Sequence, residues 1–253
     1  MQPICDPESL CKCCGSTAGL FGVVDFNKNC INAPLSLSGI PIYYYRCRDC
    51  GFIFTTFFDA FTEIQFKRLI YNKQYIDVDP DFREARPRQN AQIISMMLGG
   101  NKDISILDYG GGSGLLGEML TTMGFRNVET YDPLFPDASV KPTIHYDCIV
   151  CFEVVEHTTR PKATFDDIFT LLKESGVVIF STLTQPADME ERGVNWWYIG
   201  PRNGHVSIYT RKSLKTVIEA AGLGFGSFSE SWHLIFRNMP RFAAHLLSDL
   251  FPC

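Results

Sequence analysis

The chain has 253 residues, of which 45% are hydrophobic and ten are cysteines, and its formal net charge is −5. This length and composition are sufficient for a soluble protein with one sizeable core and a small additional module. The acidic balance gives no sign of a polyanion-binding surface, which argues against nucleic acid as a partner. The sequence shows neither a signal peptide nor an apolar run of membrane-spanning length, so we expect a cytoplasmic protein that does not bind membranes.

Two Cys-x2-Cys pairs near the amino terminus are each followed by a glycine. The four cysteines are Cys11, Cys14, Cys47 and Cys50. This spacing lets two thiolates of a pair turn onto one tetrahedral zinc ion, whereas a reducing compartment does not maintain disulfides. We therefore predict a zinc ribbon over residues 1–57. Cys5, Cys13 and Cys30 lie nearby, so the assignment of ligands can shift by a residue.

Residues 58–100 are expected to form a helical connector or lid. Apolar residues at helical spacing occupy one face of its first part: Phe61, Ile64, Phe66, Leu69 and Ile70. A second helix is predicted from about Pro87 to Leu98, because a proline is favoured in the first turn of a helix.

The run ISILDYGGGSGLLG predicts a strand, a glycine loop and the start of a helix. The strand ends near Asp108, at the sheet edge where doubly wound folds bind their ligands. Gly110, Gly111 and Gly112 then let the backbone approach a ligand too closely for any side chain. An acid in this position suits a cofactor with a cationic amine.

Glycines in G-x-G-x-x-G spacing, Gly112, Gly114 and Gly117, also permit a dinucleotide cofactor. An NAD-type oxidoreductase is therefore one alternative, although this spacing alone is a weak signal.

Later segments continue the pattern of strands. NVETYD ends at Asp132, YDCIVCFEVVEH ends at His157, and GVVIFST is a further buried strand. Together with DYGGGSG, these segments resemble the successive motifs of class I S-adenosylmethionine-dependent methyltransferases. The resemblance implies a Rossmann-like, doubly wound, seven-stranded α/β sheet over residues 101–238, with S-adenosylmethionine as the cofactor.

The resemblance also assigns roles to individual residues. Asp132 would accept hydrogen bonds from the ribose hydroxyls, and Phe152 and Glu153 would lie beside the methionine part of the cofactor. A solvated loop side chain is the alternative for Glu153. The segment LIYNKQY, which contains Tyr75, resembles a tyrosine-bearing segment that closes over the cofactor in ribbon-containing relatives; packing at a domain junction is the alternative.

Cys148 and Cys151 also have Cys-x2-Cys spacing. Inside a strand they point to opposite faces, so we predict packing roles for both.

The segment from Pro133 to Tyr146 is too short for the usual helix and third strand. We therefore expect at most a stub of a strand around Thr143 and Ile144.

The region after the fifth strand is where these enzymes place their substrate contacts. Trp196, Trp197 and Tyr198 are candidates for the wall of an apolar pocket, with packing of the loop against the core as the alternative. NGHVSIYT resembles the histidine motif of sugar C-methyltransferases and related natural-product enzymes. His205 is accordingly the first candidate for a general base, with a structural role in the turn as the alternative.

Glu156 and His157 are the next catalytic candidates, although in the resembling family this pair often organises the loop below the cofactor. Residues 239–253 are predicted to form a helical tail, packed on the body or on a partner subunit, which leaves a homodimer open. The sugar enzymes' carboxyl-terminal domain has no counterpart in the sequence, which argues against a nucleotide-sugar substrate.

The sequence as a whole predicts methyl transfer to a small-molecule acceptor by in-line displacement. Two other classes remain as alternatives: a nucleic-acid or protein methyltransferase that uses the ribbon for recognition, and a binding protein without turnover. The basic residues available to the first alternative are few: Lys12, Lys28, Arg46 and Arg48.

Overall fold

The computed structural model describes residues 8–250, so Cys5 lies outside the described residues. The chain folds into two compact units, and it passes between them several times. Unit 1 contains the described residues up to Pro80 together with Val155–Thr164 and Leu183–Val217. Unit 2 contains Asp81–Val154, Phe165–Thr182 and the described residues from Ile218 onward.

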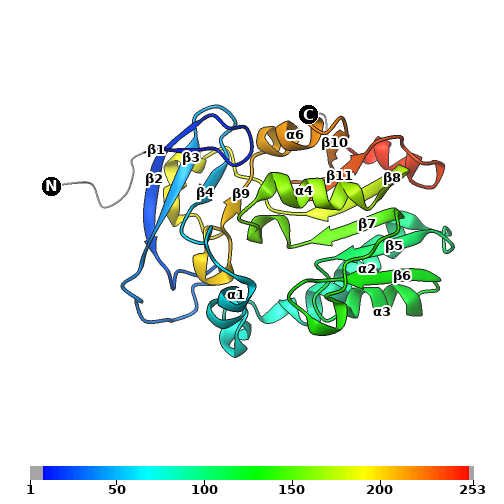
Figure 1. Ribbon diagram of the computed structural model, residues 1–253, viewed down its shortest axis with the longest axis horizontal. Helices are drawn as coiled ribbons and strands as arrows, with labels where there is room; N and C mark the ends of the chain where they lie inside the picture. The colour runs from blue at the N-terminus through cyan, green and yellow to red at the C-terminus, as the bar shows by residue number, and fades with distance from the viewer. Residues whose placement is uncertain (1–7, 251–253) are drawn as a thin grey trace. The chain divides into compact units, whose positions relative to one another are not determined.

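Unit 2 is built on a six-stranded sheet in the order β10-β11-β8-β7-β5-β6 (Figure 1). The strands are β5 (Ser105–Tyr109), β6 (Asn127–Tyr131), β7 (Tyr146–Phe152), β8 (Leu172–Ser181), β10 (Gly224–Ser227) and β11 (Trp232–Phe236). The pairs β5–β6, β5–β7 and β7–β8 are parallel, whereas β11 is antiparallel to both β8 and β10. This arrangement confirms the expected α/β, Rossmann-like sheet.

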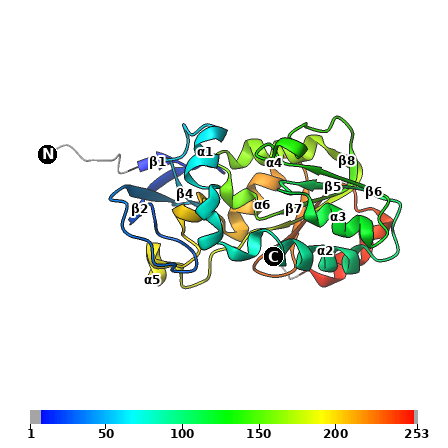
Figure 2. The same ribbon diagram turned by 90° about the horizontal axis from the view of Figure 1, so that it is seen from below.

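Helices cover both faces of this sheet. On one face, α2 (Ala85–Leu98) and α3 (Leu115–Thr122) lie side by side, as seen from below in Figure 2. They share an apolar core with β5, β7, β8, β11 and the 3₁₀ segment η7 (Arg241–Asp249). On the other face, Phe165 of α4 (Pro161–Thr170) packs edge-on against Phe180 of β8. Burial on both faces explains why β5, β7 and the second half of β8 are mostly apolar.

The cysteines of β7 behave as packing residues. Cys148 belongs to the core beneath α2 and α3, whereas Cys151 is buried outside that cluster. Residues three apart in a strand face opposite sides of the sheet, so these two thiols do not face one another.

The sheet has one strand fewer than expected. Residues 132–145 contain only the 3₁₀ turn η3 (Pro136–Ala138), and neither Thr143 nor Ile144 forms a strand. The expectation of seven strands was therefore wrong for the described residues. The segment is too short to cross over as a helix and return as a paired strand, so β6 is left at the edge of the sheet.

Unit 1 contains an antiparallel sheet in the order β1-β2-β3-β4-β9. Its strands are β1 (Glu8–Leu10), β2 (Thr17–Asp25), β3 (Pro41–Cys47), β4 (Ile53–Thr55) and β9 (Ser207–Ile208). Four of these strands come from the predicted ribbon, but β9 comes from far along the chain and pairs with β4 through Ile208 and Ser207. The residues that follow His205 are thereby attached to the ribbon sheet.

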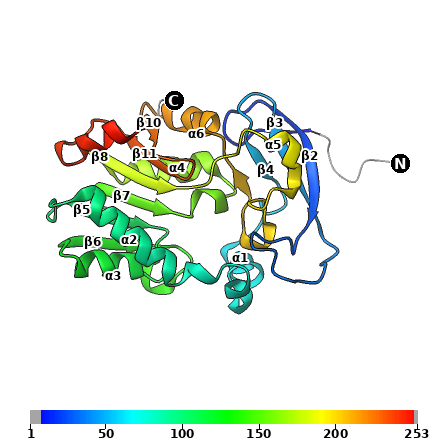
Figure 3. The same ribbon diagram turned by 180° about the vertical axis from the view of Figure 1, so that it is seen from behind.

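Short helices complete unit 1. Helix α1 (Glu63–Leu69) begins with a capping box between Thr62 and Gln65, and the 3₁₀ turn η1 (Lys73–Asp77) follows it. Beyond β8, α5 (Met189–Arg192) leads into the turn η5 (Gly193–Asn195), which lies against β2 (Figure 3). The other short turns are η2 (Pro80–Phe82), η4 (Val155–His157) and η6 (Pro201–Asn203).

Thr210 caps helix α6 (Arg211–Glu219), because its hydroxyl accepts a hydrogen bond from the Ser213 backbone N–H at 2.9 Å. No helix within residues 8–250 has both the length and the apolar character needed to cross a membrane.

Candidate functional sites

Three acidic residues gather at the carboxyl edge of the parallel strands in unit 2. Asp108 lies near the end of β5, in register with Thr130 of β6 and Val150 of β7. Asp132 follows β6 directly, and Glu153 follows β7 directly. This edge is the ligand-binding edge of open α/β sheets.

Asp108 is a buried carboxylate that lacks full hydrogen bonding. Its side chain is 2% exposed, and its Oδ2 atom accepts no hydrogen bond. Burial, together with the nearby charge of Asp132, raises the pKa of Asp108 to about 7. An ionised carboxylate in such a place needs a positive partner, and a cationic amine of a ligand would supply one.

The glycine loop forms a cradle at the same edge. A Cβ atom on Gly111 would lie 2.1 Å from Asp108 Oδ2, and one on Gly110 would lie 2.4 Å from a Val154 methyl group. Gly110 also has a φ of +74°. Only glycine therefore fits these two positions, which leaves backbone groups exposed to a ligand without any side chain in between.

Backbone hydrogen bonds hold the Asp132 carboxylate in a fixed orientation. Asp132 accepts hydrogen bonds from the backbone N–H groups of Gly112 at 3.0 Å and Leu134 at 2.7 Å. A carboxylate fixed in this way at the ligand-binding edge is an acceptor for hydroxyl groups of a ligand.

Glu153 has a φ of +55°, an unusual conformation for a residue with a side chain. The Ser181 hydroxyl donates to its carboxylate at 2.9 Å and accepts from its backbone N–H at 3.1 Å. Such backbone strain is often kept at functional sites. Phe152 lies just before it and packs against Trp232, with a distance of 4.8 Å between ring centroids.

The four ribbon cysteines converge in unit 1. The Sγ atom of Cys14 lies 3.5 Å from Cys47 Sγ and 3.5 Å from Cys50 Sγ. Cys11 Sγ lies 3.6 Å from Cys50 Sγ. Four sulfurs around a tetrahedral zinc ion lie about 3.8 Å apart, given Zn–S bonds of about 2.3 Å. The cluster is therefore close to the size of a zinc site, and all four cysteines are unbridged.

The two cysteine pairs have the same local geometry. In each, the glycine after the second cysteine donates its N–H to the carbonyl of the first cysteine, at 2.9 Å for Gly15 and 3.1 Å for Gly51. Both glycines have a positive φ, which explains their place in the motif. Cys13 lies outside the four-sulfur group, and Cys30 instead lies 3.5 Å from a ring nitrogen of His205.

Glu156, His157 and His205 form a second cluster in unit 1. One potential ligand atom from each lies within 4.8 Å of the others. Glu156 is fully buried, and His205 is 6% exposed. The two imidazole rings meet edge to face, with centroids 5.0 Å apart. The structure thus brings together the three residues predicted as catalytic candidates.

Tyr198 connects this cluster, a role that the sequence did not reveal. Its hydroxyl donates to Glu156 Oε1 at 2.5 Å, and its backbone carbonyl lies 2.8 Å from His205 Nδ1. Tyr44 donates to the carbonyl of His205 at 2.7 Å. The predicted aromatic wall is only partly exposed, because Trp196 and Tyr198 are buried and Trp197 is 48% exposed.

Tyr75 lies in η1 of unit 1. It is buried, and its hydroxyl donates to the carbonyl of Asn203 at 3.3 Å. Its ring packs against Tyr71, with centroids 5.2 Å apart. Closure of Tyr75 over a cofactor stays a prediction.

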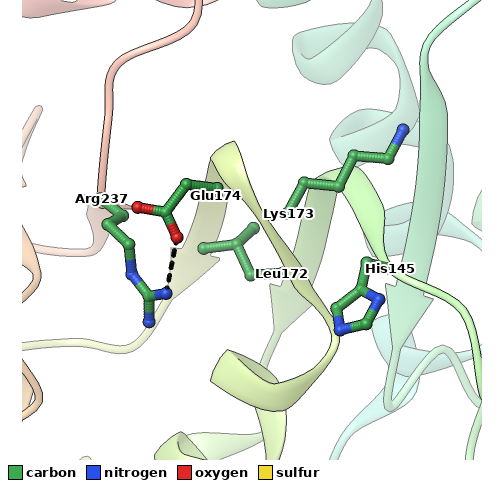
Figure 4. A pocket seen from close by; sticks show the side chains of 5 residues that line it. All are labelled: His145, Leu172, Lys173, Glu174 and Arg237. Atoms are coloured by element: carbon green, nitrogen blue, oxygen red, sulfur yellow. Dashed lines mark hydrogen bonds and ion pairs between the residues drawn. The ribbon is translucent and has the colours of Figure 1, made fainter.

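A separate hollow of about 550 Å³ lies at the amino ends of β7 and β8 (Figure 4). Its charged side chains already have partners: Glu174 pairs with Arg237 at 2.9 Å, and Lys173 pairs with Asp147 at 2.9 Å. Because it is at the strand edge opposite to Asp108, it is not the expected cofactor site.

Comparison with known proteins gives the family. A family model described as a methyltransferase domain matches residues 82–224, more than half of the chain, so the chain belongs to this methyltransferase family. This membership argues against the oxidoreductase alternative.

Curated relatives and solved structures agree with the fold. Ubiquinone biosynthesis O-methyltransferases from two strains of Rickettsia bellii are 30% identical over 105 residues, which cover 33% of this chain and 43% of theirs. The match therefore spans less than half the length of these relatives. An O-methyltransferase family protein from Burkholderia thailandensis has a similar fold, with a TM-score of 0.51 and 14% identity over 72% of this chain and 64% of its own.

The raised pKa of Asp108 predicts a specific pH dependence of stability. The native state binds a proton at Asp108 more tightly than the unfolded state, whose carboxyl has the usual value of 3.8. The free energy of unfolding should therefore fall as pH rises from about 4 to about 7, and Asp108→Asn should remove this contribution. Urea unfolding of both proteins across this range measures it.

The variant should gain stability relative to wild type as the pH rises, whereas Asp137→Asn, at an exposed position in η3, should not. A difference between Asp108→Asn and wild type that does not change with pH would contradict this assignment.

Proposed function

We propose that the protein transfers a methyl group from S-adenosylmethionine to a small-molecule acceptor. The observation that carries this proposal is the buried, incompletely bonded Asp108 carboxylate beside a glycine cradle in a methyltransferase-family domain. When bound, the cofactor supplies an electrophilic methyl carbon on a sulfonium centre. The protein then has to position the acceptor and remove its proton.

The carboxyl edge of unit 2 holds the cofactor in this proposal. Asp108 faces the amino group of its methionine part, and Asp132 accepts hydrogen bonds from its ribose. The glycine loop approaches it through backbone atoms, and Phe152 and Glu153 flank the methionine part. Tyr75 covers the bound cofactor.

The acceptor side of the reaction is assigned to Glu156, His157 and His205. A backbone carbonyl only accepts hydrogen bonds, so His205 Nδ1 carries the hydrogen that faces the carbonyl of Tyr198. Its Nε2 is then the basic nitrogen, suited to remove or direct a proton near neutral pH. The similarity to ubiquinone biosynthesis O-methyltransferases supports an oxygen atom of a small molecule as the acceptor.

We further propose that Cys11, Cys14, Cys47 and Cys50 bind a structural zinc ion. The ion closes the tetrahedron, and with no open position it has no direct part in the chemistry. Hydrogen bonding, first from Cys13 and then from Cys50, lowers the pKa of the Cys11 thiol, whereas hydrogen bonding with Cys11 raises the pKa of the Cys50 thiol. Zinc binding requires all four as thiolates, so it would release the protons that this cluster holds.

The ribbon's basic residues favour a small molecule over a nucleic acid. Lys12 pairs with Asp59, Arg46 with Glu190, and Arg48 with Glu8. Lys28 donates to backbone carbonyls of Trp196 and Ile199. Cations that are already engaged within unit 1 contribute little to a phosphate-binding surface.

The first test concerns Asp132. Asp132→Ala should weaken S-adenosylmethionine binding at least about tenfold, because hydrogen bonds to a charged group contribute about 1.5 to 3 kcal/mol. Isothermal titration calorimetry measures the affinity. Asp137→Ala removes an exposed carboxylate from the same segment and should bind normally. Equal affinities for the two variants would exclude Asp132 from the cofactor site.

The zinc proposal is tested by metal analysis. Cys47→Ser combined with Cys50→Ser should lower the zinc content by about one ion per chain and unfold the ribbon, because a module this small depends on its metal. Cys13→Ser should retain that zinc, since Cys13 lies outside the four-sulfur group. A wild-type protein prepared without chelators and free of zinc would refute the site.

The third test concerns His205. His205→Asn keeps a side-chain donor for the carbonyl of Tyr198 but removes the basic Nε2. Methyl transfer from labelled cofactor to a small-molecule extract should fall about 100-fold or more, with S-adenosylmethionine affinity unchanged. The control is His145→Asn, at an exposed position, which should keep wild-type turnover. Wild-type turnover in the His205 variant would remove this residue from the mechanism.

A further inference from the structure

The cluster of Glu156, His157 and His205 has the composition of an open metal site. Two imidazole nitrogens and one carboxylate oxygen form a common three-ligand set for catalytic zinc and for non-haem iron. One ligand atom of each residue lies within 4.8 Å of the others. Ligands around one ion lie about 3.4 Å apart, so modest side-chain movement would close the site.

Both histidines are oriented as metal-binding histidines usually are. His157 Nδ1 lies 3.1 Å from the carbonyl of Gly204, and His205 Nδ1 lies 2.8 Å from the carbonyl of Tyr198. Since carbonyl oxygens only accept, each Nδ1 carries the hydrogen and each Nε2 carries the lone pair. A metal-binding imidazole typically donates its other N–H to a carbonyl or carboxylate in this way.

Tyr198 orients two of the three residues at once. Its hydroxyl holds Glu156 Oε1 at 2.5 Å, while its own carbonyl fixes the tautomer of His205. Glu156 and His157 are adjacent in η4, and His205 follows the turn η6. Hydrogen bonds from Tyr198 and to backbone carbonyls thus orient all three residues.

The charge balance also suits a divalent cation. Glu156 is fully buried beside the two histidines, and a divalent cation among them would offset the charge of its carboxylate. One carboxylate and two neutral imidazoles carry one negative charge, so a bound divalent ion would leave one positive charge. An anionic or hydroxyl oxygen of a ligand could then take an open position on the ion.

We propose that Glu156, His157 and His205 bind a divalent transition-metal ion, distinct from the ribbon zinc, with open positions for an oxygen ligand. The inference deepens the proposed function and rests on it for the identity of that ligand as the methyl acceptor. Metal binding itself requires neither cofactor nor acceptor. A bound ion would occupy the His205 lone pair, so in this proposal activation of the acceptor oxygen by the ion replaces proton removal by His205. Loss of turnover in His205→Asn alone does not distinguish the two roles.

The test uses full-length protein with its ribbon loaded with zinc. Mn²⁺ is titrated in the absence of cofactor and acceptor, and free Mn²⁺ is followed by electron paramagnetic resonance. Mn²⁺ is the probe because the thiolates of the ribbon prefer zinc. We expect about one Mn²⁺ bound per chain, displaced by added Zn²⁺ in accordance with the usual order of metal affinities.

Variants separate ligands from supporting residues. His157→Asn and His205→Asn should each abolish binding of Mn²⁺. Tyr198→Phe keeps the carbonyl and removes only the hydroxyl, so its affinity should fall about 10- to 100-fold. His145→Asn should bind as wild type does. Circular dichroism and the ribbon zinc content report whether each variant is folded.

The inference is overturned if folded wild-type protein binds no Mn²⁺, or if both histidine variants bind it with unchanged affinity. Failure of the proposed function would look different: S-adenosylmethionine would not bind in calorimetry, whatever the metal result. Metal binding without cofactor binding would therefore preserve this site and refute the methyltransferase activity.

Discussion

The close approach of the glycine loop to the buried Asp108 carboxylate is the constraint on which the cofactor edge depends. Gly111 leaves no room for a side chain beside Asp108 Oδ2, and Gly112 ties the loop to Asp132. Two acids are therefore held near one another in a place of low polarity, which raises the pKa of Asp108. This is a costly arrangement for the protein alone, and it is suited to a cationic ligand.

The second constraint is the pairing of β9 with β4 in unit 1. A strand of two residues from late in the chain joins the ribbon sheet, and His205 lies two residues before it. The ribbon therefore has a structural role beyond a separate appendage: its sheet holds the segment that carries a candidate catalytic residue. The tyrosines Tyr44 and Tyr198 then fix that segment through hydrogen bonds.

Hydrogen bonds to backbone carbonyls give the histidine cluster its chemical character. They set the tautomers of His157 and His205, so that the basic nitrogen of each ring is Nε2. The same geometry would suit either proton transfer or metal binding. The two roles differ in whether a cation occupies the site.

The sequence by itself determined the Rossmann-like class, the glycine loop with its acid, and the pairs of ribbon cysteines, because each depends on a local pattern of spacing and backbone freedom. It also limited the space available for a third strand. Only the tertiary structure decided that β9 joins the ribbon sheet and that Tyr198 bridges Glu156 and His205. These contacts join residues that are far apart in the chain, or depend on tautomers and side-chain directions, and local periodicity carries no information on either.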